Sequence, residues 1–457
     1  MSSDGLVIND TLRRFAPSWR WPLLLAAFAL APGLARADDW VYTAREGDTL
    51  SGLAGTYTQW RGYWREMQVL NHIADPRKLP TGSKIRIPVD WLRFEPAPAR
   101  VMQTHGDCEV LPANTDTPQP AQEGMALHGG DRVRTGPEGN MSLAFADGST
   151  LLVRAGSLLA LDSLSLFRPG TLVDMRLRLQ QGAVDSKVVP APAGIAPRFR
   201  IVTPAAVAAV RGTDFRVGAA TEGSEGMRNE TLKGSVEVAG AGGRRAVPAG
   251  FGVAAQANQA PPATRKLLAP PDLAGLPAVV EALPVAFAWP HRSDETAYRA
   301  QIAPNARFET LLADRRSPVA DAELGSLPDG DYALRVRGID AAGLEGFDAI
   351  HAFKVNARPE PPYAVAPEEA GEVPTGRPRF LWAIPDEAQR YHLQLSSSAD
   401  FTRPLRDFPA IIATSLDLDQ ELPPGRYFWR IASIDAQGDH GPYGEVHAFI
   451  VKPPQAP

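Results

Sequence analysis

The sequence is short of cysteine and of long apolar runs, and both shortages narrow what the protein can be. Cys108 is the one cysteine in 457 residues, so no intramolecular disulfide can form even in an oxidising compartment. The main apolar run, residues 21–30, has about ten residues, whereas a membrane-spanning helix needs roughly eighteen or more. The net charge is −5, and the sequence has no stretch rich in Lys and Arg, so nucleic-acid binding is not expected.

Catalytic and metal-binding motifs are missing as well. The sequence has no Gly-x-Ser-x-Gly elbow, HExxH helix or Cys-x-x-Cys pair, and the glycine run at residues 240–243 lacks the Lys-Ser/Thr of a phosphate loop. His105, Asp107 and Cys108 lie close together, but without a second cluster they do not form a zinc pattern. We therefore expect a protein that is not an enzyme, with no catalytic residues, no metal and no cofactor.

The N-terminus has the three parts of an export signal. Arginines occur between residues 13 and 20, the apolar run follows at 21–30, and residues 35–37 form an Ala-x-Ala cleavage site. This order predicts a signal peptide at residues 1–37 and a mature chain that starts near Asp38, without a membrane span. Because no cysteine stands at the cleavage site to take a lipid, attachment in the periplasm or cell envelope must be non-covalent.

Residues 40–91 combine short strands with short helices. After a strand around Tyr42 and a tight turn, Asp48 and Thr49 are good N-cap residues for a helix. Apolar side chains then follow at helical spacing, and these are Leu50, Leu53, Ala54 and Tyr57.

The second half of this segment predicts another helix and a closing strand. The helix is expected over residues 60–70, with Asn71 ending it in the left-handed conformation that asparagine tolerates. After a turn at residues 80–82, residues 84–88 alternate as a short strand, whose Pro88 suits an edge or an end.

This strand–helix–helix–strand order resembles the LysM module. The residues that carry the resemblance are Tyr42, Glu46-Gly47-Asp48-Thr49-Leu50, Asn71-His72-Ile73, Asp75-Pro76, Gly82 and Ile85-Arg86-Ile87-Pro88. Members of that family bind N-acetylglucosamine-containing glycans, peptidoglycan or chitin, in a shallow groove between the loop before the first helix and the loop after the second. The resemblance therefore implies a glycan-binding site made of Gly47, Asp48, Thr49, Leu50, Asn71, His72, Ile73, Arg77 and Leu79.

The chemistry of such a ligand suits these loops. A neutral sugar chain offers acetamido groups and ring C–H faces, so a site needs backbone donors and acceptors with a few apolar contacts, and little charge. Residues 58–64 are longer and more aromatic than the usual junction between the helices. The alternative is a small α+β fold that has kept no ligand.

After residue 91 the residue composition and the hydrophobic pattern of the chain change. Residues 92–120 are rich in proline and poor in apolar periodicity, which predicts a linker. Residues 121–256 consist of short alternating runs separated by turns, typical of an all-β domain. A hairpin is expected where residues 141–145 meet residues 150–153 through Asp147-Gly148.

Two further strands are expected in this domain. Around Met175 and Leu177, apolar and charged residues alternate, which predicts a half-buried strand. Residues 203–215 are small and apolar on both faces until Arg211, which predicts a buried strand that ends in a polar bend.

This block resembles the FecR domain, the periplasmic sensing part of regulators that act on sigma factors. The residues that carry the resemblance are Gly130-Asp131-Arg132-Val133-Arg134-Thr135-Gly136, Phe145-Ala146-Asp147-Gly148-Ser149, Gly182-Ala183-Val184, Thr203-Pro204, Val210-Arg211-Gly212-Thr213-Asp214-Phe215 and Lys233-Gly234-Ser235-Val236-Glu237-Val238. The cytoplasmic anti-sigma segment and membrane helix of those regulators are not seen in the sequence, so sigma-factor regulation is not carried over. Arg211, Thr213 and Asp214 are adjacent polar residues, and a structural role in a turn is favoured over a binding role.

The C-terminal part repeats itself. Prolines within residues 257–282 predict a second linker, and after it Phe287 and Trp289 recur as Phe380 and Trp382, 93 positions later. Two β-sandwich repeats are expected, at residues 283–356 and 376–453, separated by a linker at residues 357–375. They resemble fibronectin type III modules, whose expected role here is that of spacer or adhesive scaffold.

Together these patterns predict a multidomain, mainly β fold with one small α+β module. The function favoured is a non-enzymatic envelope protein that binds peptidoglycan and presents β-domains to an unidentified envelope protein. The alternative is a sensory component of an envelope signalling system, with the FecR-like domain as receiver. A wall hydrolase is a weaker possibility, because the β-domains occupy the space that a catalytic domain would need.

Overall fold

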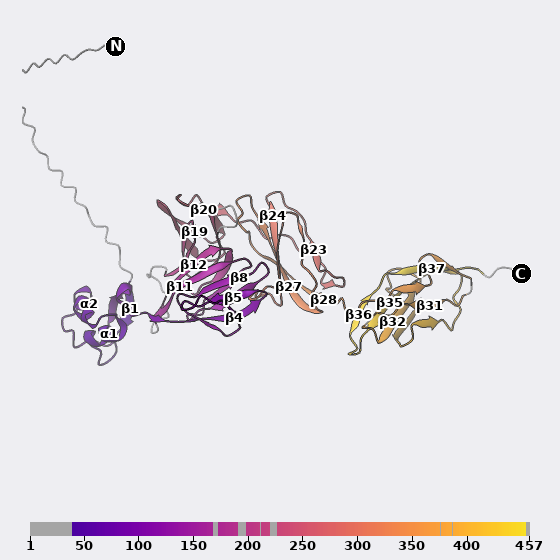
Figure 1. Cartoon of the computed structure of the whole chain (residues 1–457), viewed down its shortest axis with the longest axis horizontal. Coiled ribbons are helices and arrows are strands. Elements are labelled where there is room, and N and C mark those ends of the chain that lie inside the picture. Colours follow the sequence, from indigo (N-terminus) through magenta and orange to yellow (C-terminus); the bar gives the residue numbers. More distant parts are fainter. Residues whose placement is uncertain are drawn as a thin grey trace, which may run out of the picture.

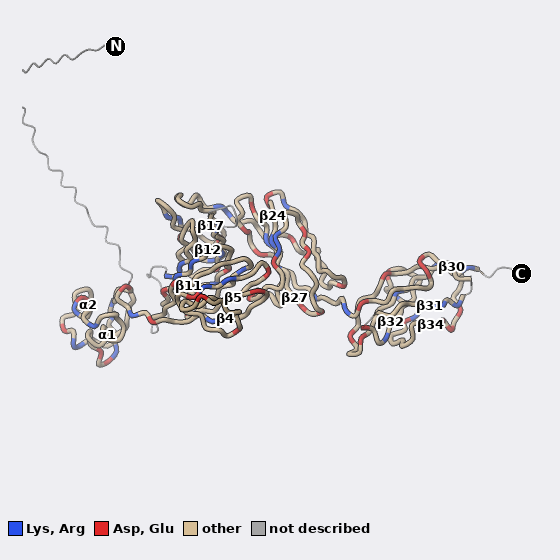
Figure 2. Tube along the Cα trace, viewed as in Figure 1, with Lys and Arg blue, Asp and Glu red and all other residues tan. Residues whose placement is uncertain are grey.

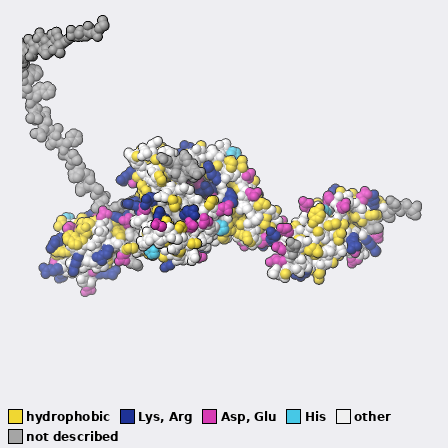
Figure 3. All heavy atoms as spheres, viewed as in Figure 1, with side chains coloured by type: hydrophobic (Ala, Val, Ile, Leu, Met, Phe, Trp, Pro, Cys, Tyr) yellow, Lys and Arg dark blue, Asp and Glu magenta, His cyan; other side chains and the backbone are white. Residues whose placement is uncertain are grey.

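The computed structural model describes residues 39–167, 172–190, 198–210, 212–219, 226–374, 376–385 and 387–453. The small helical unit, the large β-sandwich and the two repeats follow one another in a row (Figure 1 and Figure 3). The predicted multidomain, mainly β fold is confirmed. The expected signal peptide lies outside the described residues, and within them no helix has the length and apolarity needed to cross a membrane.

The N-terminal unit is built on one antiparallel strand pair, β1 (Asp39–Thr43) with β2 (Lys84–Pro88). Between them come α1 (Leu50–Tyr57) and α2 (Trp64–Leu70). The Thr49 hydroxyl caps α1 as expected, because Oγ1 accepts the Gly52 N–H at 3.0 Å. The second helix starts later than expected, since Arg61–Tyr63 form the 3-10 turn η1.

The end of α2 differs from the expectation by one residue. Asn71 has φ −101°, and His72, with φ 53°, takes the left-handed conformation instead. The Asn71 side chain donates to the Arg86 carbonyl at 2.8 Å and accepts the Arg86 N–H at 2.7 Å. These two bonds tie α2 to β2 and keep Asn71 at a negative φ, so the reversal moves to His72.

The N-terminal unit packs directly on the sandwich. Its core contains Phe167 and Leu172, from the paired strands β11 (Leu158–Phe167) and β12 (Leu172–Gln181) of that domain, and the Phe167 ring meets Trp40 edge-on at 4.8 Å. After β2 the 3-10 turn η2 (Val89–Trp91) leads into the sandwich, where Arg198 pairs with Asp90. The module is therefore docked, and a flexible tether does not separate it from the next domain.

The sandwich consists of two sheets that enclose one core. The first sheet runs in the order β21 (Arg265–Lys266), β20 (Phe251–Gln256), β17 (Gly226–Thr231), β16 (Asp214–Gly218), β13 (Ala183–Lys187), β10 (Thr150–Val153), β9 (Asn140–Ala144), β4 (Ala99–His105), β7 (Ala126–Leu127). The second runs in the order β19 (Gly243–Pro248), β18 (Ser235–Gly240), β15 (Val207–Val210), β14 (Phe199–Val202), β12 (Leu172–Gln181), β11 (Leu158–Phe167), β8 (Arg132–Thr135), β5 (Cys108–Leu111), β6 (Gln119–Pro120), with β3 (Glu95–Pro96) beside β11. The side chains that the two sheets turn toward each other form one apolar cluster, which includes Leu143, Leu177 and Phe199.

Several expected elements are confirmed. The hairpin predicted around Asp147-Gly148 is β9 paired with β10, and the half-buried strand is β12, where Met175 and Leu177 are buried. The strand expected over residues 203–215 is shorter, because β15 ends at Val210 and the next strand, β16, starts at Asp214.

The expected linker at residues 92–120 is wrong. Residues 99–105 form β4, which pairs with β9, and residues 108–111 form β5, which pairs with β8. Apolar and polar residues alternate over a few positions here, which places Ala99 and Val101 in the core. The prolines lie at strand ends and sheet edges, where the missing N–H does not remove a hydrogen bond between strands. The sandwich therefore begins near residue 95.

The two repeats are separate β-sandwiches with their own cores. The expected linker at residues 357–375 is wrong, because Ala364–Ala366 and Gly371–Val373 within it are strands of the second repeat. In the first, one sheet runs β22 (Val279–Val280), β28 (Ala349–Val355), β27 (Gly330–Ile339), β24 (Ala297–Ala303), β25 (Ala313–Ser317), and β23 (Ala286–Ala288) pairs with β26 (Asp321–Glu323). In the second, one sheet runs β30 (Gly371–Val373), β37 (His447–Val451), β35 (Gly425–Ile434), β32 (Arg390–Ser396), β33 (Arg406–Ile411) with β36 (His440–Tyr443) on β35, and the other runs β29 (Ala364–Ala366), β31 (Arg379–Trp382), β34 (Ser415–Asp417).

The first repeat is packed against the outer face of the first sheet. The predicted linker at residues 257–282 joins this contact, since it contributes β21 and β22 and buries Leu267. Leu152 of β10 lies in an apolar cluster with Phe308 and Leu311 of the repeat. Basic and acidic stretches of the chain come together where β24 and β27 face the sandwich (Figure 2).

Candidate functional site

Two loops of the N-terminal unit meet beside the start of α1. The Leu50 N–H donates to the Pro76 carbonyl at 2.9 Å, which joins the loop before α1 to the loop after α2. The Asp48 carboxylate accepts the Arg45 N–H at 2.7 Å and the Tyr42 hydroxyl at 2.9 Å. Burial, with this hydrogen bond, raises the pKa of Tyr42 to about 12, so the hydroxyl keeps its proton at neutral pH.

The backbone of the loop after α2 is held by hydrogen bonds to both main-chain and side-chain groups nearby. The Ile73 N–H donates to the Gln68 carbonyl at 3.0 Å, and Gln68 Nε2 donates back to the Ile73 carbonyl at 3.0 Å. The Arg77 N–H donates to the Asp75 carboxylate at 3.0 Å. Both loops are thus ordered before any ligand arrives, which lowers the entropic cost of binding.

The structure divides the nine predicted glycan-binding residues into a surface group and a supporting group. Leu50 and Leu79 are buried in the core, and the Asn71 amide is engaged with β2. The side chains that reach the surface around the junction of the loops belong to Asp48, Thr49, His72, Ile73 and Arg77, with Gly47 beside them. Gly47 has φ +84° and no atom within 4 Å of where a Cβ would lie, so its backbone is open to solvent. Their assignment to a glycan groove stays a prediction.

Of the polar residues singled out in the sandwich, Asp214 has a side-chain partner, whereas Thr213 is held through its backbone and its buried hydroxyl has no hydrogen-bond partner. The Thr213 carbonyl accepts the Val188 N–H at 2.9 Å, and the Asp214 carboxylate pairs with the Lys233 ammonium group at 3.0 Å. Arg211 lies outside the described residues. These contacts fit the structural role that the sequence favoured.

Cys108 is a buried thiol. Its Sγ lies 3.4 Å from the His105 carbonyl and 3.3 Å from the Asn140 carbonyl. Burial raises its pKa to about 11, so little thiolate exists at neutral pH, and reactivity is not expected.

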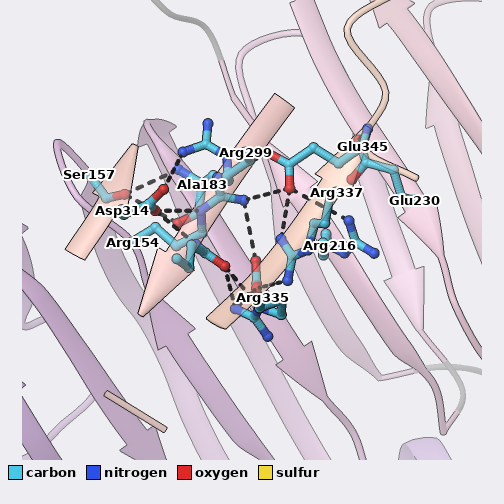
Figure 4. A network of polar contacts seen from close by, with 12 residues as sticks. Arg154, Ser157, Ala183, Arg216, Glu230, Arg299, Asp314, Arg335, Arg337 and Glu345 are labelled. Carbon is cyan, nitrogen blue, oxygen red and sulfur yellow. Dashed lines mark hydrogen bonds and ion pairs between the residues drawn. The ribbon is translucent and has the colours of Figure 1, made fainter. Parts of the chain in front are cut away.

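The most polar buried region was not predicted from the sequence. It lies between the outer face of the first sheet and the first repeat (Figure 4). Strand register places Leu152, Asp185, Arg216 and Glu230 side by side across β10, β13, β16 and β17. The repeat contributes the opposing residues, which are Arg299, Asp314, Arg335, Arg337, Glu345 and Asp348.

Glu345 is the hub of this network. Its carboxylate accepts from Arg154 at 3.0 Å, from Arg299 at 2.7 Å and from Arg337 at 2.7 Å. Burial alone would raise the pKa of Glu345, but these arginines hold it well below its ordinary value. The Glu345 N–H also donates to Glu230 at 3.2 Å, so the hub joins both domains through side chain and backbone.

Asp185 of the sandwich anchors the other side of the network. Its Oδ2 accepts from Arg337 at 3.0 Å and from Arg335 at 3.3 Å. The interface also contains hydrogen bonds between uncharged groups. The Asn140 side chain donates to the Leu311 carbonyl at 2.7 Å and accepts the Leu311 N–H at 2.9 Å. The sandwich and the first repeat therefore share one specific, hydrogen-bonded interface.

Three residues of this polar face in the first repeat recur at the matching positions of the second repeat. Arg335 donates to Gln301 at 2.9 Å and stacks on the Phe308 ring at 4.2 Å. In the second repeat the matching Arg430 donates to Gln394 at 2.9 Å and stacks on the matching phenylalanine ring, Phe401, at 4.4 Å. The repeated Arg, Gln and Phe were a signal for a shared polar face, but the sequence did not show what covers it.

Comparisons with known proteins identify the first two domains. The family model described as LysM domain matches residues 42–88, and the one described as FecR protein matches residues 131–237. No curated protein matches the chain.

Solved structures give low scores over parts of the chain. A candidate anti-sigma factor from Parabacteroides distasonis is 17% identical with a TM-score of 0.24, and the match covers 30% of this chain and 59% of that one. Fibronectin(III)-like modules of Clostridium thermocellum CbhA are 11% identical (TM-score 0.17, 37% of this chain, 85% of that one). A segment of two fibronectin type III domains from chicken tenascin is 13% identical (TM-score 0.19, 37% of this chain, 91% of that one). From the two family matches, the chain carries a LysM domain at residues 42–88 and a FecR domain at residues 131–237.

Proposed function

We propose that this protein is a non-enzymatic component of the cell envelope that binds peptidoglycan through its LysM domain and presents its β-domains to a protein partner in the periplasm. The LysM match supports glycan binding. The observation that carries the proposal is the 2.9 Å bond from the Leu50 N–H to the Pro76 carbonyl, which brings the two loops together. Gly47, His72 and Ile73 remain accessible around that junction.

The binding should be weak. The surface group offers open backbone, one hydroxyl, one half-buried isoleucine and few charges for a neutral sugar chain. A single shallow site of this kind gives dissociation constants on the order of micromolar to millimolar, because few contacts offset the lost freedom of a flexible glycan. A high concentration of such sites in the sacculus would still keep much of the protein bound, by mass action.

The test is sedimentation of the mature chain with purified sacculi at low and high salt. Ile73→Ala should reduce the bound fraction several-fold, since it removes the apolar contact in the loop after α2. Val69→Ala is the matched control, because Val69 is an apolar residue of α2 that is 75% exposed and lies outside both loops. Binding that vanishes with salt and ignores Ile73→Ala would show a charge-driven surface and overturn the groove.

A second candidate function is sensing within an envelope signalling system. The FecR match at residues 131–237 favours it, as does the interface that couples this domain to the first repeat. Deletion of the protein followed by transcript profiling tests this idea. A specific change in a small set of transcripts supports sensing. An unchanged transcript profile contradicts it and leaves wall anchoring as the proposed function.

A further inference from the structure

The junction between α1 and α2 of the LysM domain carries aromatic side chains outside the predicted groove. Trp60 is 57% exposed, although tryptophan is highly buried on average. The centre of its ring lies 5.4 Å from that of Tyr63, edge-on, and the Tyr63 ring is stacked on Trp91 at 4.7 Å. Tyr63 and Trp91 are half-buried. These three residues form one aromatic surface, which we call the aromatic platform.

The platform is held in place before any ligand arrives. The Trp60 ring packs so closely on Gly62 that a Cβ at position 62 would overlap its six-membered part. The Trp60 carbonyl accepts the Tyr63 N–H at 3.2 Å. Gln59 ties this turn to the segment that follows β2, because its N–H donates to the Trp91 carbonyl at 2.9 Å. A rigid aromatic surface binds a ligand at a low cost in conformational entropy.

Arg61 lies between the platform and the predicted groove. Its side chain runs along α1, about 3.7 Å from where a Cβ of Gly55 would lie, and its Nε donates to the Ser51 hydroxyl at 3.2 Å. Ser51 directly follows Leu50, a residue of the groove loop. Because α1 has eight residues and is about 12 Å long, a linear glycan of several sugar units can reach both places. The exposed guanidinium of Arg61 can donate to sugar oxygens on the way.

The chemistry of the platform suits a sugar ring better than a membrane surface. The face of an indole ring is electron-rich, so it attracts the weakly positive C–H groups on one face of a sugar ring. Trp and Tyr also favour lipid headgroups, but a helix that binds a membrane places aliphatic side chains beside them. The exposed large aliphatic residues of this domain, Val41 and Val69, belong to β1 and α2 and not to the platform.

We propose that the aromatic platform is a second sugar subsite of the LysM domain, where one N-acetylhexosamine ring of a glycan stacks on Trp60. This inference rests on the proposed binding of peptidoglycan and extends that site from the groove along α1. A glycan that contacts both subsites is held more tightly than one that contacts the groove alone, because its second contact is intramolecular. The aromatic junction at residues 58–64 thereby takes part in binding.

Fluorine NMR of the mature chain labelled with 5-fluorotryptophan tests the proposal. A linear hexamer of N-acetylglucosamine should shift the Trp60 signal saturably, and Trp60→Phe identifies that signal by its loss. The signals of Trp289 and Trp429, in the cores of the two repeats, should stay unchanged. In titration calorimetry, Trp60→Ala should weaken hexamer binding about three- to tenfold, the effect of losing one aromatic contact.

A second variant moves the ring without removing it. Gly62→Ala places a methyl group where the Trp60 ring packs, so the ring must shift and hexamer binding should weaken to a similar degree. Val69→Ala is the matched control, because it truncates an exposed apolar side chain of the same domain and should leave hexamer binding unchanged. The signal of Trp40, which packs against the domain core, reports whether each variant keeps its fold.

Four results would overturn the proposal. Amide shifts at residues 47–50 and 71–79 with an unmoved Trp60 signal would confine the glycan to the groove and leave the proposed function standing. Hexamer binding unchanged in both Trp60→Ala and Gly62→Ala would place the sugar elsewhere. A Trp60 signal that responds to vesicles of phosphatidylethanolamine and phosphatidylglycerol, and not to the hexamer, would make the platform a membrane contact. No saturable response to the hexamer in either place would overturn the platform and the proposed glycan binding together.

Discussion

Glu230 makes the stability of the central interface depend on pH in an unusual direction. It lies in β17 opposite Arg216 of β16 and is 3% exposed, and its carboxyl accepts the Glu345 N–H at 3.2 Å. Burial and the Glu345 charge raise its pKa from an ordinary 4.5 to about 7. The folded protein therefore keeps a proton that the unfolded chain releases between these two values.

The sign and the size follow from this difference. Where the folded state binds more protons than the unfolded state, the free energy of unfolding falls as pH rises. The loss begins near pH 4.5 and is complete a little above pH 7, and a difference of about 2.5 pKa units corresponds to roughly 3 kcal/mol. Glu230→Gln removes the titrating carboxyl but keeps a side-chain oxygen that accepts the Glu345 N–H. It should match the wild type near pH 4 and exceed its stability by about 3 kcal/mol at pH 8.

The assay is urea unfolding of the mature chain at pH values from 4 to 8, followed by hydrogen exchange of peptides from β17 and β27. Glu237→Gln is the matched control, because Glu237 of β18 belongs to the same domain but its side chain is 44% exposed. The control should change stability by less than about 0.5 kcal/mol at every pH. Identical pH profiles for Glu230→Gln and the wild type, or a difference that is largest at acid pH, would refute the reasoning.

Three further predictions concern the contacts between domains and the helix cap. Glu345→Gln should destabilise the FecR domain and first repeat by roughly 3–5 kcal/mol in urea unfolding, since it leaves buried arginines without their counter-charge; a loss below about 1 kcal/mol would show that the network is solvated. Phe167→Ala should cost about 3–5 kcal/mol and speed hydrogen exchange in β1, because the ring lies in the shared core with the LysM domain; unchanged exchange in β1 would mean that the two domains are not docked. Thr49→Ala should lower the melting temperature of the LysM domain by the equivalent of about 1 kcal/mol and Thr49→Asn by much less, since asparagine also caps helices; equal losses would show that the cap contributes nothing.

Local patterns in the sequence were enough for most of the secondary structure. Helical spacing from Leu50 predicted α1, the N-cap residue Thr49 predicted its start, and Asp147-Gly148 predicted the β9–β10 hairpin. These features depend on residues that are close together in the chain. For the same reason the sequence failed at Asn71, whose backbone is decided by hydrogen bonds to Arg86 in a distant strand.

The candidate site was only partly accessible to such reasoning. Residues of the LysM loops follow from a resemblance, but which of them reach the surface depends on packing, which buries Leu50 and Leu79. The charged interface was not predicted because residues such as Arg335 and Arg337 alternate with apolar neighbours along β27 and resemble solvent-facing positions. Only the tertiary structure shows that another domain covers that face.

The most direct test of the central claim is amide chemical-shift mapping of the mature chain with a soluble N-acetylglucosamine oligomer. The account predicts saturable shifts at residues 47–50 and 71–79, with a dissociation constant on the order of micromolar to millimolar, and weaker binding for Ile73→Ala at unchanged fold. Shifts confined to other parts of the chain, or no saturable shifts in the LysM loops, would contradict it.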